Sequence, residues 1–208
     1  MKMSADRKMI AAEIPGYTYG TGEAATSPVS LEELEQLKQS VGFTKEDEQY
    51  LRMAGEVLAD QTKQLVEKWR GVIAETPHLA KHSRGPDGKA IARYSENSGL
   101  RFQQWILDTC FRTYDRNWLN YQHEIALRHS RLKKNKTDGV PSTAYVPLRD
   151  VLAFTAVING TIKPSLAAKG HSAAEVDKMH NAWCKSVQLQ IALWAEPYAN
   201  SKLAPDEW

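Results

Sequence analysis

The chain has few cysteines and no long apolar run, and each shortage excludes a class of protein. Among its 208 residues only Cys110 and Cys184 are cysteines, too few for a disulfide framework and not spaced as a metal site. Before residue 28 the only apolar run is residues 9–12, shorter than the core of a signal peptide. No uninterrupted stretch approaches the length of a membrane span. We therefore expect a soluble protein of a reducing cytoplasm.

The charge balance gives no indication of a nucleic-acid or membrane partner. The formal net charge is +2, with 42% hydrophobic and 25% charged residues, which is the composition of an ordinary globular domain. Such a small excess of either sign predicts neither nucleic-acid binding nor attachment to a membrane surface. The catalytic patterns HExxH, GxSxG, CxxC and a glycine-rich phosphate loop are also missing from the sequence.

Apolar residues recur at helical spacing along most of the chain, and no alternating pattern predicts strands. Capping-box patterns begin at Ser30 and Ser172, Asp115 is placed to cap a helix, and Pro164 predicts a kink. The expected helices cover residues 30–41, 44–76, 89–111, 115–129, 147–170 and 172–196. We predict an all-α fold, with an extended arm at 1–28, a domain at 29–200 and a tail at 201–208.

Histidine is the most informative of the reactive residue types. His123 and His129 are six residues apart, so they lie about 240° apart around a helix and cannot bind one metal together. His129 is in register with the apolar face of its helix and points inward. Two interpretations follow: a core histidine satisfied by a backbone carbonyl, or an axial ligand of haem, which needs one imidazole, apolar contacts and a few basic residues.

Several segments resemble the protoglobins, single-domain globins related to globin-coupled sensors. The resemblance extends from Ile14 to about Tyr198, and the helix that ends in Leu-Arg-His is its most specific part. The matching segments are IPGYTYG (14–20), MAGEVL (53–58), WILDTC (105–110), WLNYQHEIALRH (118–129), KKN (133–135), TD (137–138), IKP (162–164), NAW (181–183) and LQ (189–190).

The resemblance implies a globin fold with an additional N-terminal helix and arm, which binds haem b. It makes His129 the proximal iron ligand, fixed by a hydrogen bond from its other ring nitrogen. Phe102, Phe154 and Ile158 match residues that line the distal side. Trp69 matches a pocket aromatic and Arg101 a basic residue near a haem propionate.

The chain departs from the family at three positions near the predicted pocket. Arg70 replaces a common tyrosine; it can donate to bound oxygen, pair with a propionate or turn to solvent. His82 is a candidate sixth iron ligand, although a histidine next to a turn is usually solvated. Ser83 stands where globins usually stack a phenylalanine on the haem. Such changes also occur when haem pockets are redesigned.

The function predicted from the resemblance is binding of diatomic gases, namely O2, CO or NO, at haem iron. One alternative is a haem enzyme of the peroxidase-like, nitrite- or NO-converting or engineered group-transfer kind. Another is a gas-sensor module that acts on a partner in trans, since the roughly ten residues after Tyr198 are too few for an output domain. Reversible oxygen spectra favour the gas binder, whereas turnover beyond that of free haem favours the enzyme.

We also predict a homodimer built on the two C-terminal helices. The last helix carries more apolar residues than one buried stripe needs, and the helix before it adds further ones. Two such helices from each subunit make an isologous four-helix contact. The alternative is that these side chains complete the core of one subunit. The residues concerned are Met179, Trp183, Val187, Ile191, Trp194, Val151, Ala156 and Val157.

Overall fold

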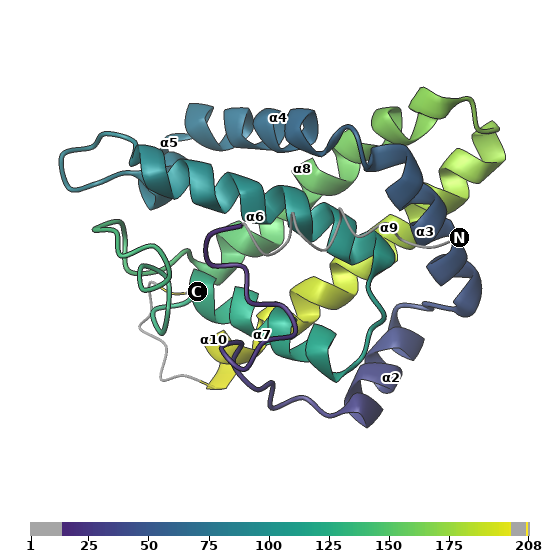
Figure 1. Cartoon of the computed structure of the whole chain (residues 1–208), viewed down its shortest axis with the longest axis horizontal. Helices are drawn as coiled ribbons and strands as arrows, with labels where there is room; N and C mark the ends of the chain where they lie inside the picture. Colours follow the sequence, from purple (N-terminus) through teal and green to yellow (C-terminus); the bar gives the residue numbers. More distant parts are fainter. Residues whose placement is uncertain (1–13, 201–206, 208) are drawn as a thin grey trace.

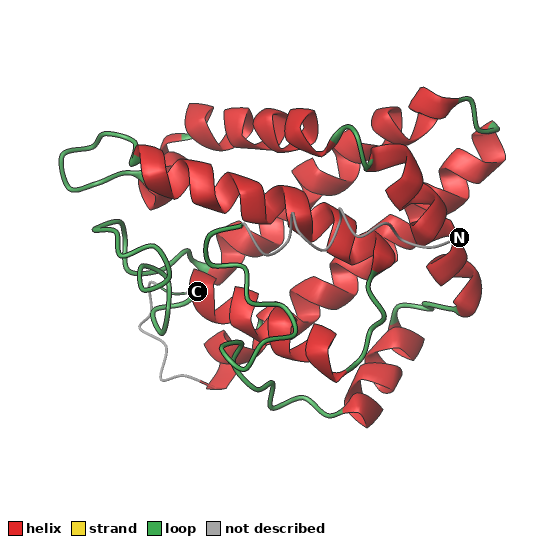
Figure 2. Cartoon of the chain, viewed as in Figure 1, coloured by secondary structure: helices red, strands yellow, loops and turns green. Residues whose placement is uncertain are grey.

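The computed structural model describes residues 14–200 and Glu207. Within these residues the chain is helical throughout, and the nearest approach to a strand is one isolated bridge between Arg84 and Ala90. Figure 2 shows the helices joined by loops, without a sheet. The predicted all-α class is therefore confirmed, while residues 1–13 of the predicted arm and most of the predicted tail lie outside the described residues.

The helices follow the predicted order, and most begin at the predicted caps. The Ser30 and Ser172 capping boxes are both formed, and the Asp115 side chain accepts a hydrogen bond from Trp118 N. Pro164 lies inside its helix, which ends two residues later. The elements are α2 (Leu31–Ser40), α3 (Lys45–Leu58), α4 (Thr62–Glu75), α5 (Pro77–Ala80), α6 (Ala92–Phe111), α7 (Arg116–His129), α8 (Leu148–Leu166), α9 (Ala173–Trp194) and α10 (Glu196–Asn200), with 3-10 turns at Lys81–Ser83 and Ala167–Lys169.

The single helix predicted over 44–76 is wrong, because the chain breaks into α3 and α4 at residues 59–61. Gln61 explains the break. Its side-chain amide donates to Val57 O at 2.8 Å and to Ser165 O at 3.2 Å, so it satisfies a carbonyl at the end of α3 and joins it to α8. Apolar spacing continues through the break because both helices turn their apolar faces to the same core.

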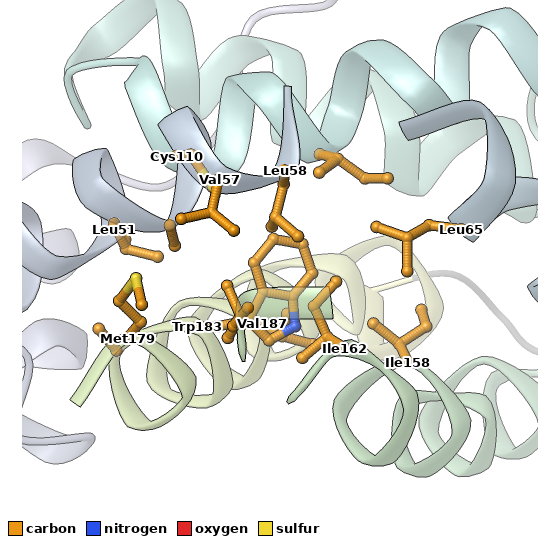
Figure 3. Close-up of a cluster of buried hydrophobic side chains, with 14 of the residues drawn as sticks. Leu51, Val57, Leu58, Leu65, Cys110, Ile158, Ile162, Met179, Trp183 and Val187 are labelled. Carbon is orange, nitrogen blue, oxygen red and sulfur yellow. The ribbon is translucent and has the colours of Figure 1, made fainter. Parts of the chain in front are cut away.

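Helix α3 packs against both α6 and α9, and α9 also contacts α7 and α8; Figure 1 shows α9 crossing behind α6 and α7. Trp183 of α9 is fully buried, and in Figure 3 its ring lies between side chains of α3 and α8. Gly55 permits the close approach of α3 to α6, since a Cβ there would lie 2.5 Å from a Phe111 ring atom and 2.7 Å from Cys110 Cβ. The core therefore depends on α9 as its central element.

The predicted dimer surface on α9 needs a correction. Met179, Trp183, Val187 and Ile191 are at most 4% exposed and belong to the core of this chain. Because α9 is covered by α3, α7 and α8, its extra apolar residues complete one subunit. Of the α9 residues named for the contact, only Trp194 is half-buried.

Helix α8 is the most apolar part of the described chain, and it is poorly covered. Residues Leu148–Lys169 have a mean hydropathy of 1.3 over an 18-residue window, of which 22% is buried. By length and composition this segment meets the criterion for a membrane span, contrary to the expectation that no stretch approaches one. In the structure it packs as a helix of the bundle against α9, α3 and α4. Its remaining apolar surface requires another explanation.

Residues 14–29 cross the outside of α6 and α7 (Figure 1). The Tyr17 hydroxyl donates to buried Asp108 of α6 at 2.6 Å and accepts from Arg112. Arg128 of α7 donates to Gly16 O at 2.7 Å. We call residues 14–29 the arm from here on; it fastens α6 to α7 from outside.

Candidate functional site

The last residue of α7 is His129, which is half-buried. Its Nδ1 is 2.8 Å from Ile125 O, the carbonyl one turn earlier. A ring nitrogen facing a carbonyl must carry the proton, so Nε2 is left as the acceptor or metal-binding atom. Burial lowers the pKa of His129, although the bond to Ile125 opposes the shift. The ring is therefore neutral at neutral pH, as a metal-binding imidazole must be.

Trp194, at the end of α9, lies against the His129 ring. The two ring centroids are 5.6 Å apart with an interplanar angle of 17°. The indole Nε1 of Trp194 donates to Gln122 Oε1 at 2.8 Å, and Gln122 is only 2% exposed. The register of α7 places Gln122 on the same face as His129. The sequence did not single out Trp194 or Gln122 as site residues.

Four of the predicted pocket residues come together from α4, α6 and α8. Trp69 is fully buried, and its Nε1 donates to Thr161 Oγ1 of α8 at 2.7 Å. The Phe102 ring lies 5.0 Å from that of Trp69. Ile158 is 7% exposed and lies one helical turn before Thr161, with half-buried Phe154 one turn further back. In Figure 3, Ile158 lies opposite Leu65 of α4.

Trp105 connects these residues to His129. Its ring is 6.2 Å from Trp194 and 5.5 Å from Phe102. Aromatic rings at such separations form a packed series rather than isolated contacts. His129 is therefore connected to Phe102 and Trp69, two of the predicted pocket residues, through the rings of Trp194 and Trp105.

Arg70 follows Trp69 on α4 and is half-buried. Its guanidinium donates to Ser98 Oγ of α6 at 3.2 Å, and a Cβ at Gly99 would lie 3.1 Å from it. Burial lowers its pKa, while Tyr94 and Arg101 are its electrostatic neighbours. Of the three orientations considered, the one turned to solvent is thus not adopted.

Arg101 holds the loop after α7 and the arm. It forms a two-point ion pair with Asp138, at 2.6 and 3.2 Å, and donates to Pro15 O at 2.6 Å. These contacts use much of its hydrogen-bonding capacity. Its contact with a haem propionate stays a prediction.

Lys134 is a cation of this region that sequence reasoning missed. It is 4% exposed, donates to His82 O at 2.9 Å and lies over the Tyr94 ring. Burial lowers its pKa to about 8, and Asp138 opposes the shift. The only signal in the sequence was its place in the Lys-Lys-Asn segment, within a basic loop. Around Tyr94, the cations Arg70, Arg101 and Lys134 thus lie near one another, and Asp138 is the carboxylate that acts on Arg101 and Lys134.

His82 is buried, so the expectation that a histidine beside a turn is solvated is wrong here. Its Nδ1 lies 2.7 Å from Thr143 Oγ1, and its Nε2 lies 3.8 Å from Asp150 without a hydrogen bond. Burial and the neighbouring lysines lower its pKa to about 4. Ser83 bonds to Ala80 O in its own turn. His82 thus joins the turn after α5 to the start of α8.

These residues fit a flat, apolar group that carries carboxylates. Several apolar side chains of α6, α7, α8 and α9 pack on the core while part of their surface stays uncovered, and Ile125 and Trp194 among them contact His129. Such surface beside a half-buried imidazole suits a largely apolar cofactor. The buried Lys134 and the half-buried Arg70 and Arg101 outnumber the one carboxylate among them, Asp138, which suits an anionic edge. The half-buried set is Phe102, Ile125, Leu152, Phe154 and Trp194.

The arrangement of helices is that of a globin domain. The structure is similar to the globin domain of the Geobacter sulfurreducens globin-coupled sensor, with a TM-score of 0.63 and 13% sequence identity. The match covers 79% of this chain and 96% of that domain, and at this identity it shows the fold alone. No curated protein sequence matches the chain.

The sequence model of one family, described as Protoglobin, matches residues 30–204. The chain therefore belongs to the protoglobin family, as its motifs predicted. Membership makes haem the cofactor and haem-based binding of gaseous ligands the general function of the domain.

Proposed function

We propose that the chain binds haem b through His129 and holds O2, CO or NO at the opposite side of the iron. Haem iron bound by one imidazole supplies an open coordination position for a diatomic ligand. The observation that carries the proposal is the His129 ring itself. It is neutral, it is half-buried at a helix end, and its Nδ1 proton is held by Ile125 O at 2.8 Å, which leaves Nε2 free for a metal.

Trp69, Phe102, Phe154 and Ile158 form the apolar wall on the side away from His129. Their side chains offer the ligand apolar surface, and the one donor among them, Trp69 Nε1, is already bonded to Thr161. Such a wall excludes water, so Arg70 is the side chain that we propose makes a polar contact with the ligand. The proposed gas pocket is therefore apolar, with a single cationic side chain beside it.

Lys134 is the cation proposed to meet a haem propionate, together with the predicted Arg101. Lys134 is the stronger case, because burial already lowers its pKa to about 8. A propionate beside it would favour the ammonium form and offset part of the cost of burial.

A homodimer through α8 is part of the same proposal. Ala156 is exposed on α8, Val151 and Val157 are half-buried, and the segment is only 22% buried despite its hydropathy. A second copy that packs its α8 on this face would cover apolar surface that the subunit leaves open. We place this dimer in the cytoplasm, where Cys110 and Cys184 stay free thiols.

The test is replacement of His129 by alanine, with His123→Ala on another face of α7 as the matched control. We expect His129→Ala to lose the spectrum of histidine-bound ferrous haem and its CO adduct. At a thousandfold excess over the dissociation constant, haem should add about 4 kcal/mol to the unfolding free energy of the unmodified protein and of His123→Ala. An unchanged ferrous–CO spectrum in His129→Ala would reject His129 as the ligand.

A further inference from the structure

The His129 ring is held by one hydrogen bond, and one bond leaves a rotation open. The Nδ1–Ile125 contact fixes the direction in which Nε2 points. It does not fix the angle of the ring plane about that direction, which decides how the imidazole lies relative to a cofactor. A second contact must set this angle.

Trp194 supplies that contact from another helix. Its indole lies nearly parallel to the imidazole, at 17° and 5.6 Å between centroids. The indole in turn cannot rotate freely, because its Nε1 is bonded to Gln122 Oε1 at 2.8 Å and its other neighbour is the Trp105 ring. Gln122 is buried, so a lost bond would leave its oxygen without water as a substitute.

Gln122 and His129 belong to the same helix, two turns apart, and Trp194 spans the distance between them. Helix α7 thus holds Trp194 in place through Gln122, and Trp194 in turn orients His129 two turns further along the same helix. Because Trp194 ends α9, a shift of the end of α9 must change either the bond to Gln122 or the stacking on His129. The chain around His129 is tied to the same end, since Val146 N donates to His129 O and the Tyr198 hydroxyl donates to Val146 O.

We propose that Trp194, held by Gln122, is the residue that positions the proximal imidazole and links its orientation to the end of α9. The proposal rests on the proposed function, in which His129 binds the haem iron. Trp194 acts through His129 and is a positioning residue, with no contact to the gas ligand. The stacked pair also exists in the protein without haem, so its presence can be measured independently of the cofactor.

The experiment compares Trp194→Leu, Trp194→Phe and Gln122→Leu with Leu193→Ala. Leu193 is a buried α9 neighbour in a cluster that Trp194 also contacts, so this control separates loss of local packing from loss of the indole ring. In protein without haem, NMR of labelled histidine reports the ring-current shift of the His129 ring protons. We expect this shift to be lost in Trp194→Leu, retained in Trp194→Phe and reduced in Gln122→Leu. Leu193→Ala should lower stability and leave the shift unchanged.

In haem-loaded ferrous protein, resonance Raman spectroscopy reports the iron–histidine stretching band. We expect it to broaden or split in Trp194→Leu and to be restored in Trp194→Phe. An unchanged His129 shift and an unchanged band in Trp194→Leu, with haem retained, would overturn the proposal and leave His129 as the ligand. If His129→Ala keeps the band, the proposed function fails instead. Equal effects of Trp194→Leu and Leu193→Ala would reduce Trp194 to a packing residue and also overturn the proposal.

Discussion

Arg70 lies beside Trp69 on α4, and its position allows a sharp test. It is the cationic side chain next to the apolar wall, and it bonds only to the Ser98 hydroxyl among the contacts described above. A charged donor to a partly negative bound O2 contributes about 1.5–3 kcal/mol, whereas CO carries little negative charge. A hydrogen bond from Arg70 should therefore stabilise bound O2 much more than bound CO.

We predict that Arg70→Leu speeds O2 dissociation about 10- to 100-fold and barely changes CO dissociation. Stopped-flow measurement of both off-rates tests this, with Lys134→Met as the control for loss of a buried cation. If Arg70→Leu changes both gases equally, or neither, Arg70 does not contact the ligand. A lowered haem affinity in that variant would then assign it to a propionate.

His82 predicts a pH dependence of stability. Its pKa is about 4 in the folded chain, against about 6.5 for an exposed histidine. Below pH 6.5 the unfolded chain takes up the proton first, so the contribution of His82 to stability is intact above pH 6.5. It is lost as the pH falls towards 4. The groups around it are Lys81, Lys134 and Asp150.

We expect His82→Gln to flatten the loss of unfolding free energy between pH 6.5 and 4. Glutamine keeps a polar contact with Thr143 and does not titrate. Urea unfolding of both proteins at pH 7, 5.5 and 4.5 gives the comparison. A difference in stability between the two proteins that stays constant across these pH values would show that His82 does not titrate in this range.

At the scale of the helices, Gly55 and Gly71 form a natural pair for a test of packing. A Cβ at Gly55 would lie 2.5 Å from Phe111, whereas nothing lies within 4 Å of a Cβ at Gly71. We predict that Gly55→Ala destabilises the fold by about 1–3 kcal/mol. Gly71→Ala should stabilise it by about 0.5 kcal/mol or more. Equal effects of the two variants on denaturant midpoints would contradict the close approach of α3 and α6.

The helix boundaries could be read from the sequence wherever a local signal stops or starts a helix. Ser30, Asp115 and Ser172 act through bonds to residues three positions away, so their caps were predictable. The break at Gln61 was not, because its amide is satisfied partly by Ser165, 104 residues away. His129 was predictable from register and motif. Trp194, Gln122 and Lys134 were not, because each is defined by a partner on a distant segment.

The apolar residues of α9 are a second case in which contacts between distant segments could not be predicted from the sequence. Its apolar residues exceed one stripe, and the sequence alone cannot tell a partner subunit from helices of the same chain. In the structure α3, α7 and α8 surround α9, so a helix that is apolar on most sides is central rather than exposed. The uncovered apolar face lies on α8 instead.

At the scale of the whole molecule, the proposed dimer has a direct test. Ala156 is exposed on α8, so Ala156→Arg places a charge in the proposed contact, while Gln64→Arg places one on the exposed face of α4. We expect light scattering at low micromolar concentration to give twice the monomer mass for the unmodified protein and Gln64→Arg, and the monomer mass for Ala156→Arg. A stable contact should bury at least about 1,000 Å². A monomer mass for the unmodified protein rejects the dimer.

The arm has a consequence for the order in which the molecule assembles and opens. Tyr17 bonds to Asp108 across 91 residues, and Gly16 to Arg128 across 112. The arm is synthesised before its partners, and it can dock only once α6 and α7 stand in place. Contacts that close such long loops form late, and segments held from outside the core are the first to detach. We therefore expect the arm to detach locally while the rest of the domain stays folded. The backbone amides of the arm then exchange with solvent and α6 can separate from α7, whereas the tryptophan side chains of the interior stay packed.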